Sequence, residues 1–274
     1  MDIAHFETRF IPFQGGQIAY LDEGSGPPLL LMHGGGPASS GSSHYTANIA
    51  ELAQRFRVIA IDLPGHGQSS TLPMDEPTYV FYAKAARHLL ESLSLRSAHV
   101  IGYSMGGGAA LSLAALHPAS VDRLVVIGGG GNALPNLFAA RPLEGQRAMG
   151  SYARQPTREN FDTVQRLFVH DQTVIDESLL AALWEREQVR RAAHPAAAAS
   201  TPLPDDLISR LARIKAETLI VRGRDDVYAP LDQGLLSLSL IPNSRLHVFS
   251  NCGHWVQFER ANEFNPLATL FLES

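Results

Sequence analysis

The chain has 274 residues, of which 45% are hydrophobic and 18% charged, as is typical of a globular protein with apolar material for a large core. Its formal net charge of −5 offers no basic surface, so we expect no nucleic acid and no anionic membrane as a partner. The single cysteine, Cys252, excludes an intrachain disulfide and a cysteine-based metal cluster, and it suits a reducing compartment. The first residues lack the basic start and apolar core of a secretory signal, and no stretch of about 18 residues is cleanly apolar, so we expect a cytoplasmic protein.

Apolar runs and helical patterns alternate along most of the chain. Two short extended segments come first, with glycines 15 and 16 between them as a hairpin signal. Continuous apolar runs then predict buried strands at 28–32, 57–61, 98–102, 123–128, 218–223 and 245–249. Helical patterns separate or follow these strands at 44–54, 78–93, 105–116, 231–240 and 261–272. This alternation predicts an α/β fold with a mostly parallel twisted sheet and helices on both faces.

The alternation stops between about residues 132 and 212. This block shows helical patterns at 143–153, 157–168 and 176–193 but no strand, followed by a Pro/Ala-rich stretch at 194–204 that reads as a linker or a further helix. We therefore expect a core domain made of residues 1–131 and 213–274, and a helical lid at 132–212 over the C-terminal edge of the sheet.

A serine lies where a predicted strand meets a predicted helix. The segment Gly102-Tyr103-Ser104-Met105-Gly106 matches the pattern G-x-S-x-G, in which a strained turn exposes a nucleophile at the N-terminus of a helix. A serine that merely caps the helix is the alternative. The strand before it and the small residues around it favour the nucleophile.

A serine hydroxyl needs a base to accept its proton, and a carboxylate to orient that base. His254 follows the last predicted strand at the sheet edge where ligands bind, whereas His247 lies within that strand, so we expect His254 to be the base. Asp225 and Asp226 both follow the strand at 218–223, and spacing does not decide between them.

An acyl-transfer site also needs N–H groups for a developing oxyanion. Met105, directly after the serine, would supply one of them. The glycine-rich loop at 32–41, which follows the strand at 28–32, would supply the other.

Five segments in this order, HGGGP, DLPGHGQS, GYSMGG, GRDD and CGHW, resemble the α/β-hydrolase fold family over essentially the whole chain. Within it, the segments GRDDVYAPLDQGL and RLHVFSNCGHWVQFE are most similar to the meta-cleavage-product hydrolases, which hydrolyse a carbon–carbon bond in dienoates formed by aromatic ring fission. The resemblance implies that Asp226 is the triad acid and that Gly35 is the second oxyanion donor. It also implies that Trp255 forms a wall of the substrate pocket, and we expect Gly34, next to Gly35, to contact the substrate.

Three positions depart from that group, which usually has asparagine at two of them and a carboxylate-binding lid arginine at the third. Here Tyr103, His44 and Leu183 occupy these positions. Either the substrate lacks that carboxylate or another cation replaces the arginine. Arg186 lies one helical turn from Leu183, although a solvated surface arginine is the simpler interpretation.

Other side chains have a structural and a functional interpretation. Asp62 and His66 lie in a glycine-rich loop where a turn-forming or packing role is the simpler one. Phe138 and Trp184 are candidates to line an apolar substrate pocket or to pack in the core. No metal-binding or phosphate-binding motif is found, so we expect no cofactor and no metal.

Three functions remain open from the sequence. The first is a carbon–carbon hydrolase of the meta-cleavage type acting on a small molecule. The second is a carboxylesterase, lactonase or amidase on the same scaffold, favoured by the three departures. The third is a non-catalytic ligand-binding receptor, which the apparently complete triad disfavours. Related enzymes often form homo-oligomers, but the sequence shows no interface.

Overall fold

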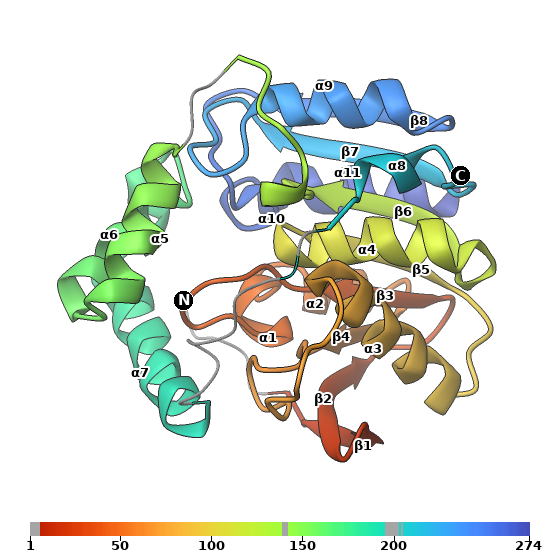
Figure 1. The fold of residues 1–274 in the computed structure, drawn as a ribbon, viewed down its shortest axis with the longest axis horizontal. Helices are drawn as coiled ribbons and strands as arrows, with labels where there is room; N and C mark the ends of the chain where they lie inside the picture. Colours follow the sequence, from red (N-terminus) through yellow and green to blue (C-terminus); the bar gives the residue numbers. More distant parts are fainter. Residues whose placement is uncertain (1–5, 139–141, 195–202, 204) are drawn as a thin grey trace.

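The computed structural model describes residues 6–138, 142–194, 203 and 205–274, and an eight-stranded sheet runs through its centre (Figure 1). The strand order is β1-β2-β4-β3-β5-β6-β7-β8. The six strands from β3 to β8 run parallel, while β2 pairs antiparallel with β4 and β1 pairs antiparallel with β2. The predicted α/β class with a mostly parallel sheet is therefore confirmed.

The strands form where the apolar runs predict them. They are β1 Arg9–Phe13, β2 Gly16–Glu23, β3 Pro28–Met32, β4 Arg57–Ile61, β5 Ala98–Tyr103, β6 Val121–Ile127, β7 Glu217–Gly223 and β8 Ser244–Phe249. The hairpin turn between β1 and β2 falls on Gln14 and Gly15, one residue earlier than predicted, and both have positive φ (47° and 81°). Two-residue hairpin loops favour this conformation because its twist matches that of the strands.

Helices pack on both faces of the sheet. The helices α3 Thr78–Ser92, α4 Met105–Leu116, α8 Ile208–Leu211 and α9 Leu231–Leu240 pack around one apolar cluster. The opposite cluster holds α2 Ile49–Leu52, α10 Val256–Glu259 and α11 Ala261–Glu273. Among the described residues, no helix has the length and apolar character needed to cross a membrane.

The predicted helix at 44–54 is wrong as a single element. The helix α1 Gly41–His44 ends where the predicted helix begins, and only α2 forms within the predicted range, because the chain between them turns inward to make buried polar contacts. The Tyr45 hydroxyl donates to the carbonyls of Met32 and Ile101, and the Asn48 amide donates to the Gln257 carbonyl. These contacts tie the loop after β3 to neighbouring strands and to α10.

Three helices interrupt the alternation and lie together beside the sheet, at the left of Figure 1. They are α5 Glu144–Arg154, α6 Arg158–Leu167 and α7 Glu177–Ala193, and we call residues 144–193 the insertion. The Pro/Ala-rich stretch falls almost entirely outside the described residues. The division into a core domain and a lid that covers the site stays a prediction.

Candidate active site

Ser104 occupies a strained turn between β5 and α4. Its φ of 51° and ψ of −112° lie in a region that side-chain-bearing residues rarely adopt. The turn fits only because its neighbours are glycines: a Cβ on Gly102 would lie 2.5 Å from the Gly106 carbonyl oxygen, and one on Gly106 would lie 2.2 Å from that of Met32. The Ser104 hydroxyl does not cap α4. The capping alternative is therefore wrong.

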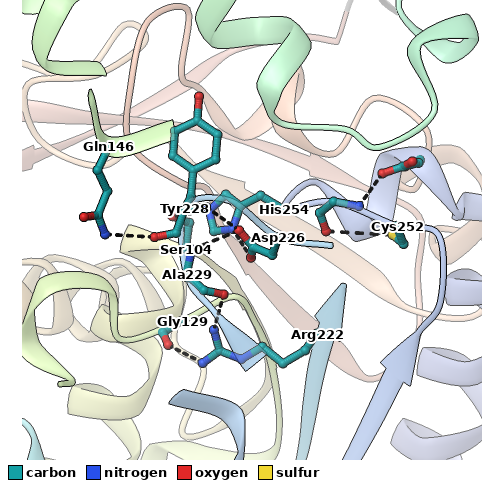
Figure 2. A network of polar contacts seen from close by, with 11 residues as sticks. Ser104, Gly129, Gln146, Arg222, Asp226, Tyr228, Ala229, Cys252 and His254 are labelled. Atoms are coloured by element: carbon teal, nitrogen blue, oxygen red, sulfur yellow. Dashed lines mark hydrogen bonds and ion pairs between the residues drawn. The ribbon is translucent and has the colours of Figure 1, made fainter. Parts of the chain in front are cut away.

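The Ser104 hydroxyl instead donates to a histidine at the end of the neighbouring loop. Ser104 Oγ lies 2.9 Å from His254 Nε2, and His254 Nδ1 lies 2.6 Å from Asp226 Oδ2 (Figure 2). The other oxygen, Asp226 Oδ1, accepts the N–H groups of Tyr228 at 2.7 Å and Ala229 at 2.9 Å. The structure thus brings together three side chains from the loops after β5, β7 and β8.

The two competing candidates lie elsewhere. His247 is exposed on β8. The Asp225 carboxylate accepts the Cys252 N–H at 3.3 Å and pairs with Arg224, so it turns away from His254. The geometry therefore selects Asp226 and His254.

Aromatic rings enclose the imidazole. Phe168 of the insertion stacks on the His254 ring at 5.8 Å with an interplanar angle of 20°, and Tyr228 and Tyr103 lie at 5.3 and 5.1 Å. The side chains of His254 and Asp226 are only 2% and 1% exposed. Electrostatic interactions within this dry site are stronger than they would be in water.

Two backbone N–H groups beside Ser104 have no partner among the described residues. Met105 begins α4, so its N–H has no intrahelical acceptor. Gly35 lies opposite, where a Cβ would be 3.2 Å from Met105 Sδ. A pair of free N–H groups that flank a nucleophile can bind an oxyanion.

Two buried histidines fix both sides of Gly34, whose carbonyl belongs to the peptide that carries the Gly35 N–H. His33 Nδ1 donates to the Gly34 carbonyl at 2.7 Å, and His44 Nδ1 accepts the Gly34 N–H at 3.0 Å. Burial, reinforced by nearby histidines, holds the pKa of His33 well below its usual range and lowers that of His44 to about 3. Both rings are therefore neutral at pH 7, as these hydrogen bonds require. Sequence reasoning missed His33, although it opens the HGGGP segment.

The three departures from the meta-cleavage-product hydrolases are all buried, and two of them, His44 and Tyr103, form a wall with Trp255. His44 lies 5.2 Å from the ring of Tyr103 and 5.6 Å from that of Trp255, whose indole N–H donates to the His44 carbonyl. Leu183 of α7 belongs to the same buried apolar cluster as Tyr103 and Trp255. Gly34 packs against this wall, since a Cβ there would lie 2.7 Å from the Tyr103 ring.

Other predicted contacts lie away from the three catalytic candidates. Phe138 is 84% exposed, so it does not line a pocket in this structure, and its N–H donates to Asp232. Because Phe138 lies within the predicted lid at 132–212, the sequence made it a candidate to line the pocket, but sequence alone does not show which way a loop side chain points. Trp184 packs against Phe161 at 5.1 Å within the insertion.

Arg186 lines a separate cavity of about 540 Å³ between α7 and the core, whose described lining includes none of Ser104, Asp226 and His254. Its guanidinium donates to the Ser42 hydroxyl at 3.0 Å. Asp62 lies in the same cavity, accepting the N–H groups of Gly41 and Gln68, and burial raises its pKa to about 6. The Asp62 hydrogen bonds support the turn-forming interpretation. The imidazole of His66 is neutral at pH 7, because burial lowers its pKa to about 4.

Two residues that sequence reasoning missed join the insertion to the loops of the site. The Glu259 carboxylate accepts the N–H groups of His170 at 3.0 Å and Asp171 at 2.7 Å, and also that of Gly253 at 2.8 Å. From α5, the Gln146 amide donates to the Tyr228 carbonyl at 3.0 Å (Figure 2). No group of three or more His, Cys, Asp and Glu side chains in the described part of the chain could hold a metal ion.

Residues 27–261 match the alpha/beta hydrolase fold family. The chain belongs to this family. It is 40% identical over 261 residues to the 2-hydroxy-6-oxo-6-phenylhexa-2,4-dienoate hydrolase of Comamonas testosteroni, covering 93% of this chain and 91% of that protein. A solved meta-cleavage product hydrolase of Pseudomonas fluorescens IP01 superposes with a TM-score of 0.86 at 28% identity, over 97% of both chains. Est816, an N-acyl homoserine lactone degrading enzyme, superposes with a TM-score of 0.78 at 25% identity, over 96% of this chain and 100% of that one. The predicted resemblance and hydrolase class are thereby confirmed.

Proposed function

We propose that this alpha/beta hydrolase is a serine hydrolase with Ser104, His254 and Asp226 as its catalytic triad. The observation that carries the proposal is the continuous line of hydrogen bonds from Ser104 Oγ through the imidazole to Asp226, at 2.9 and 2.6 Å. His254 takes the proton of Ser104 or of a water molecule, and Asp226 holds the ring and stabilises the imidazolium. The N–H groups of Gly35 and Met105 bind the oxyanion.

On an ester, Ser104 attacks the carbonyl carbon and forms an acyl-enzyme. His254 passes the proton to the departing alkoxide, and water then resolves the acyl-enzyme through the same base. On a dienoate, His254 first moves the proton of the 2-hydroxyl group to a chain carbon, so that the enol becomes a ketone. Ser104 or water then adds to the other carbonyl, the carbon–carbon bond beside it breaks, and the departing carbon takes the proton that His254 removed from the nucleophile.

As the substrate we propose a meta-cleavage-type dienoate from aromatic degradation. Support comes from relatives that are 33 to 40% identical and named hydrolases of 2-hydroxy-6-oxo dienoates. They cover at least 93% of this chain, so the likeness includes the insertion as well as the sheet.

A specific observation favours a second candidate, an esterase, lactonase or amidase. Leu183 brings no charge to the wall around Tyr103, and Arg186 faces the cavity beside Asp62 instead. A neutral acyl group would suit such a wall without leaving a buried carboxylate unpaired. The structural likeness to a lactone-degrading enzyme agrees with this candidate.

Paired assays distinguish these functions. Purified protein is offered the yellow dienoate 2-hydroxy-6-oxo-6-phenylhexa-2,4-dienoate and, separately, p-nitrophenyl butyrate, with Ser104→Ala as the control for both. We expect the dienoate colour to disappear with wild type only. Turnover of the ester alone would support the second candidate. If neither substrate reacts and a fluorophosphonate leaves Ser104 unlabelled, a receptor that kept the fold becomes the better account.

A further inference from the structure

A buried arginine lies directly beneath the proposed catalytic pair. Arg222 is on β7, where the other residues from Thr218 to Gly223 are buried and uncharged, and it is 1% exposed. In the described part of the chain, no carboxylate lies within ion-pair distance of its guanidinium, and its Nε–H has no acceptor. A buried charge without a partner is costly, so a protein that keeps one needs a reason for it.

The fold makes room for this side chain. Gly234 in α9 lies against it, and a Cβ there would be 2.8 Å from Arg222 Cγ and 3.2 Å from its Nε. A glycine within a helix costs about 1 kcal/mol relative to alanine. Because Gly234 has no side chain, α9 leaves space at this position for the buried side chain of Arg222.

The guanidinium bridges the loop after β6 and the loop after β7, the second of which carries Asp226, as Figure 2 shows. Its Nη2 donates to the Gly129 carbonyl at 2.8 Å, and its Nη1 makes a long contact of 3.5 Å with the Ala229 carbonyl. Gly129 follows Gly128, where a Cβ would lie 2.8 Å from Cε1 of the His254 ring. Ala229 donates its own N–H to Asp226 Oδ1. Arg222 is thus separated from His254 by Gly129 and Gly128, and from Asp226 by Ala229.

The guanidinium also brings a charge to this site. Burial lowers the pKa of Arg222 to about 10, and the carboxylates of Asp226 and Asp232 act against that fall, so the side chain is cationic at pH 7. By Coulomb's law, this cation repels any second positive charge placed on the imidazole of His254.

Few other charges act on this pair. Three titratable side chains face His254, and burial keeps each of them neutral near pH 7: Tyr103, Tyr228 and His44. Burial likewise raises the pKa of the Cys252 thiol, which keeps it protonated. Besides Asp226, Asp232 and Arg222, the Glu259 carboxylate also lies near the pair, since it accepts the N–H of Gly253 next to His254.

We propose that Arg222 is a positioning residue of this hydrolase, which fixes the Gly129 and Ala229 carbonyls and sets a positive charge beneath the His254–Asp226 pair. This inference rests on the proposed function. It predicts that Arg222 keeps His254 available as a neutral base at lower pH than the triad alone would.

Two variants separate the charge from the hydrogen bonds. Arg222→Gln removes the positive charge but keeps an amide group that can donate a hydrogen bond. Arg222→Lys keeps the charge but loses the planar guanidinium group that reaches both carbonyls. Arg245→Met, on the exposed side of β8, is the control because it removes a cation that solvent screens. The pH profile of kcat/KM is measured with p-nitrophenyl butyrate or with the dienoate, whichever the wild type hydrolyses. The imidazole of His254 is followed by NMR titration, which needs no turnover.

For Arg222→Gln we expect kcat/KM to fall at least about tenfold at pH 7, and the acid limb and the His254 midpoint to rise by at least about half a pH unit. Arg222→Lys should keep the wild-type midpoint, and Arg245→Met should match wild type throughout. A wild-type midpoint in folded Arg222→Gln overturns the proposal. If that variant does not fold, a shifted midpoint in Arg222→Lys overturns it, because the charge is still present. Loss of the proposed function is recognised separately, as a wild type that neither turns over a substrate nor reacts with a fluorophosphonate.

Discussion

The edge of the sheet and the insertion are built differently. At the sheet edge, each proposed catalytic side chain lies in a turn or loop that follows a strand, and backbone N–H groups fix the Asp226 carboxylate. The insertion contacts the core through a shared apolar cluster and through single hydrogen bonds: Glu187 accepts the Ala38 N–H, and the Tyr228 hydroxyl donates to the Val164 carbonyl. Strand ends and backbone hydrogen bonds therefore fix the proposed catalytic side chains, whereas mainly side chains hold the insertion against the core.

Removing the nucleophile should abolish the chemistry and leave the insertion in place. Ser104→Ala is expected to lose at least about a thousandfold in turnover of p-nitrophenyl butyrate, because Ser104 Oγ is the oxygen that attacks the ester in the proposed mechanism. Its Tm should equal or exceed that of wild type, since alanine removes no buried packing. Initial rates and thermal unfolding test this. Substantial residual turnover would move the nucleophile elsewhere.

The next largest effect should come from the insertion's buried anchor. Glu187 is 0% exposed and accepts hydrogen bonds from the Ala38 N–H at 2.7 Å, the Tyr152 hydroxyl at 2.6 Å and the Arg190 guanidinium at 2.7 Å. Glu187→Gln leaves Arg190 without its charge partner, so we expect a loss of about 3 kcal/mol in the free energy of unfolding at pH 7. Urea denaturation measures it. Glu185→Gln, exposed on the same helix, is the matched control.

The same residue gives a pH test. Burial raises the pKa of Glu187, but hydrogen bonds from Arg190 and Tyr152 outweigh it, so the pKa in the folded protein lies below the ordinary value of 4.5. A carboxyl with a lowered folded-state pKa stabilises the fold above its unfolded pKa and loses that contribution as pH falls through the folded value. The difference between wild type and Glu187→Gln should therefore be full at pH 7 and shrink progressively below about pH 4.5. A difference that grows on acidification would contradict this assignment.

Where the insertion meets the catalytic loop, the effect should be smaller. Glu259→Gln replaces one carboxylate oxygen with an NH₂ group that cannot accept the N–H groups of His170 or Gly253. Because Gly253 precedes His254, we expect kcat/KM to fall about tenfold, the cost of one charge-assisted hydrogen bond. Steady-state kinetics test this, with Glu263→Gln on α11 as the control. A loss in both variants alike would point to a general effect of charge.

The smallest effect should come from the exposed loop. Phe138→Ser is expected to change the free energy of unfolding by less than about 0.5 kcal/mol and to leave kcat/KM unchanged, because the ring contacts solvent. A large rise in KM would place Phe138 at the substrate after all and weaken the contrast between the two regions.

The sequence predicts the sheet well because apolar runs of strand length are strong local signals. It brings Ser104 and His254 to one edge for the same reason, since parallel strands end together. It does not choose between Asp225 and Asp226, because that choice depends on how β7 and β8 align in space. Arg222 escapes notice because the sequence does not reveal that a charge within a strand is buried beneath a site.

Covalent labelling of Ser104 tests the central claim most directly. The wild-type protein is treated with a fluorophosphonate and the adduct is located by mass spectrometry of its peptides, alongside Ser104→Ala. We predict a single phosphonyl adduct on Ser104, absent from the variant and formed more slowly as pH falls and His254 becomes protonated. A wild type that hydrolyses either substrate while the adduct forms on another residue, or not at all, would contradict the account.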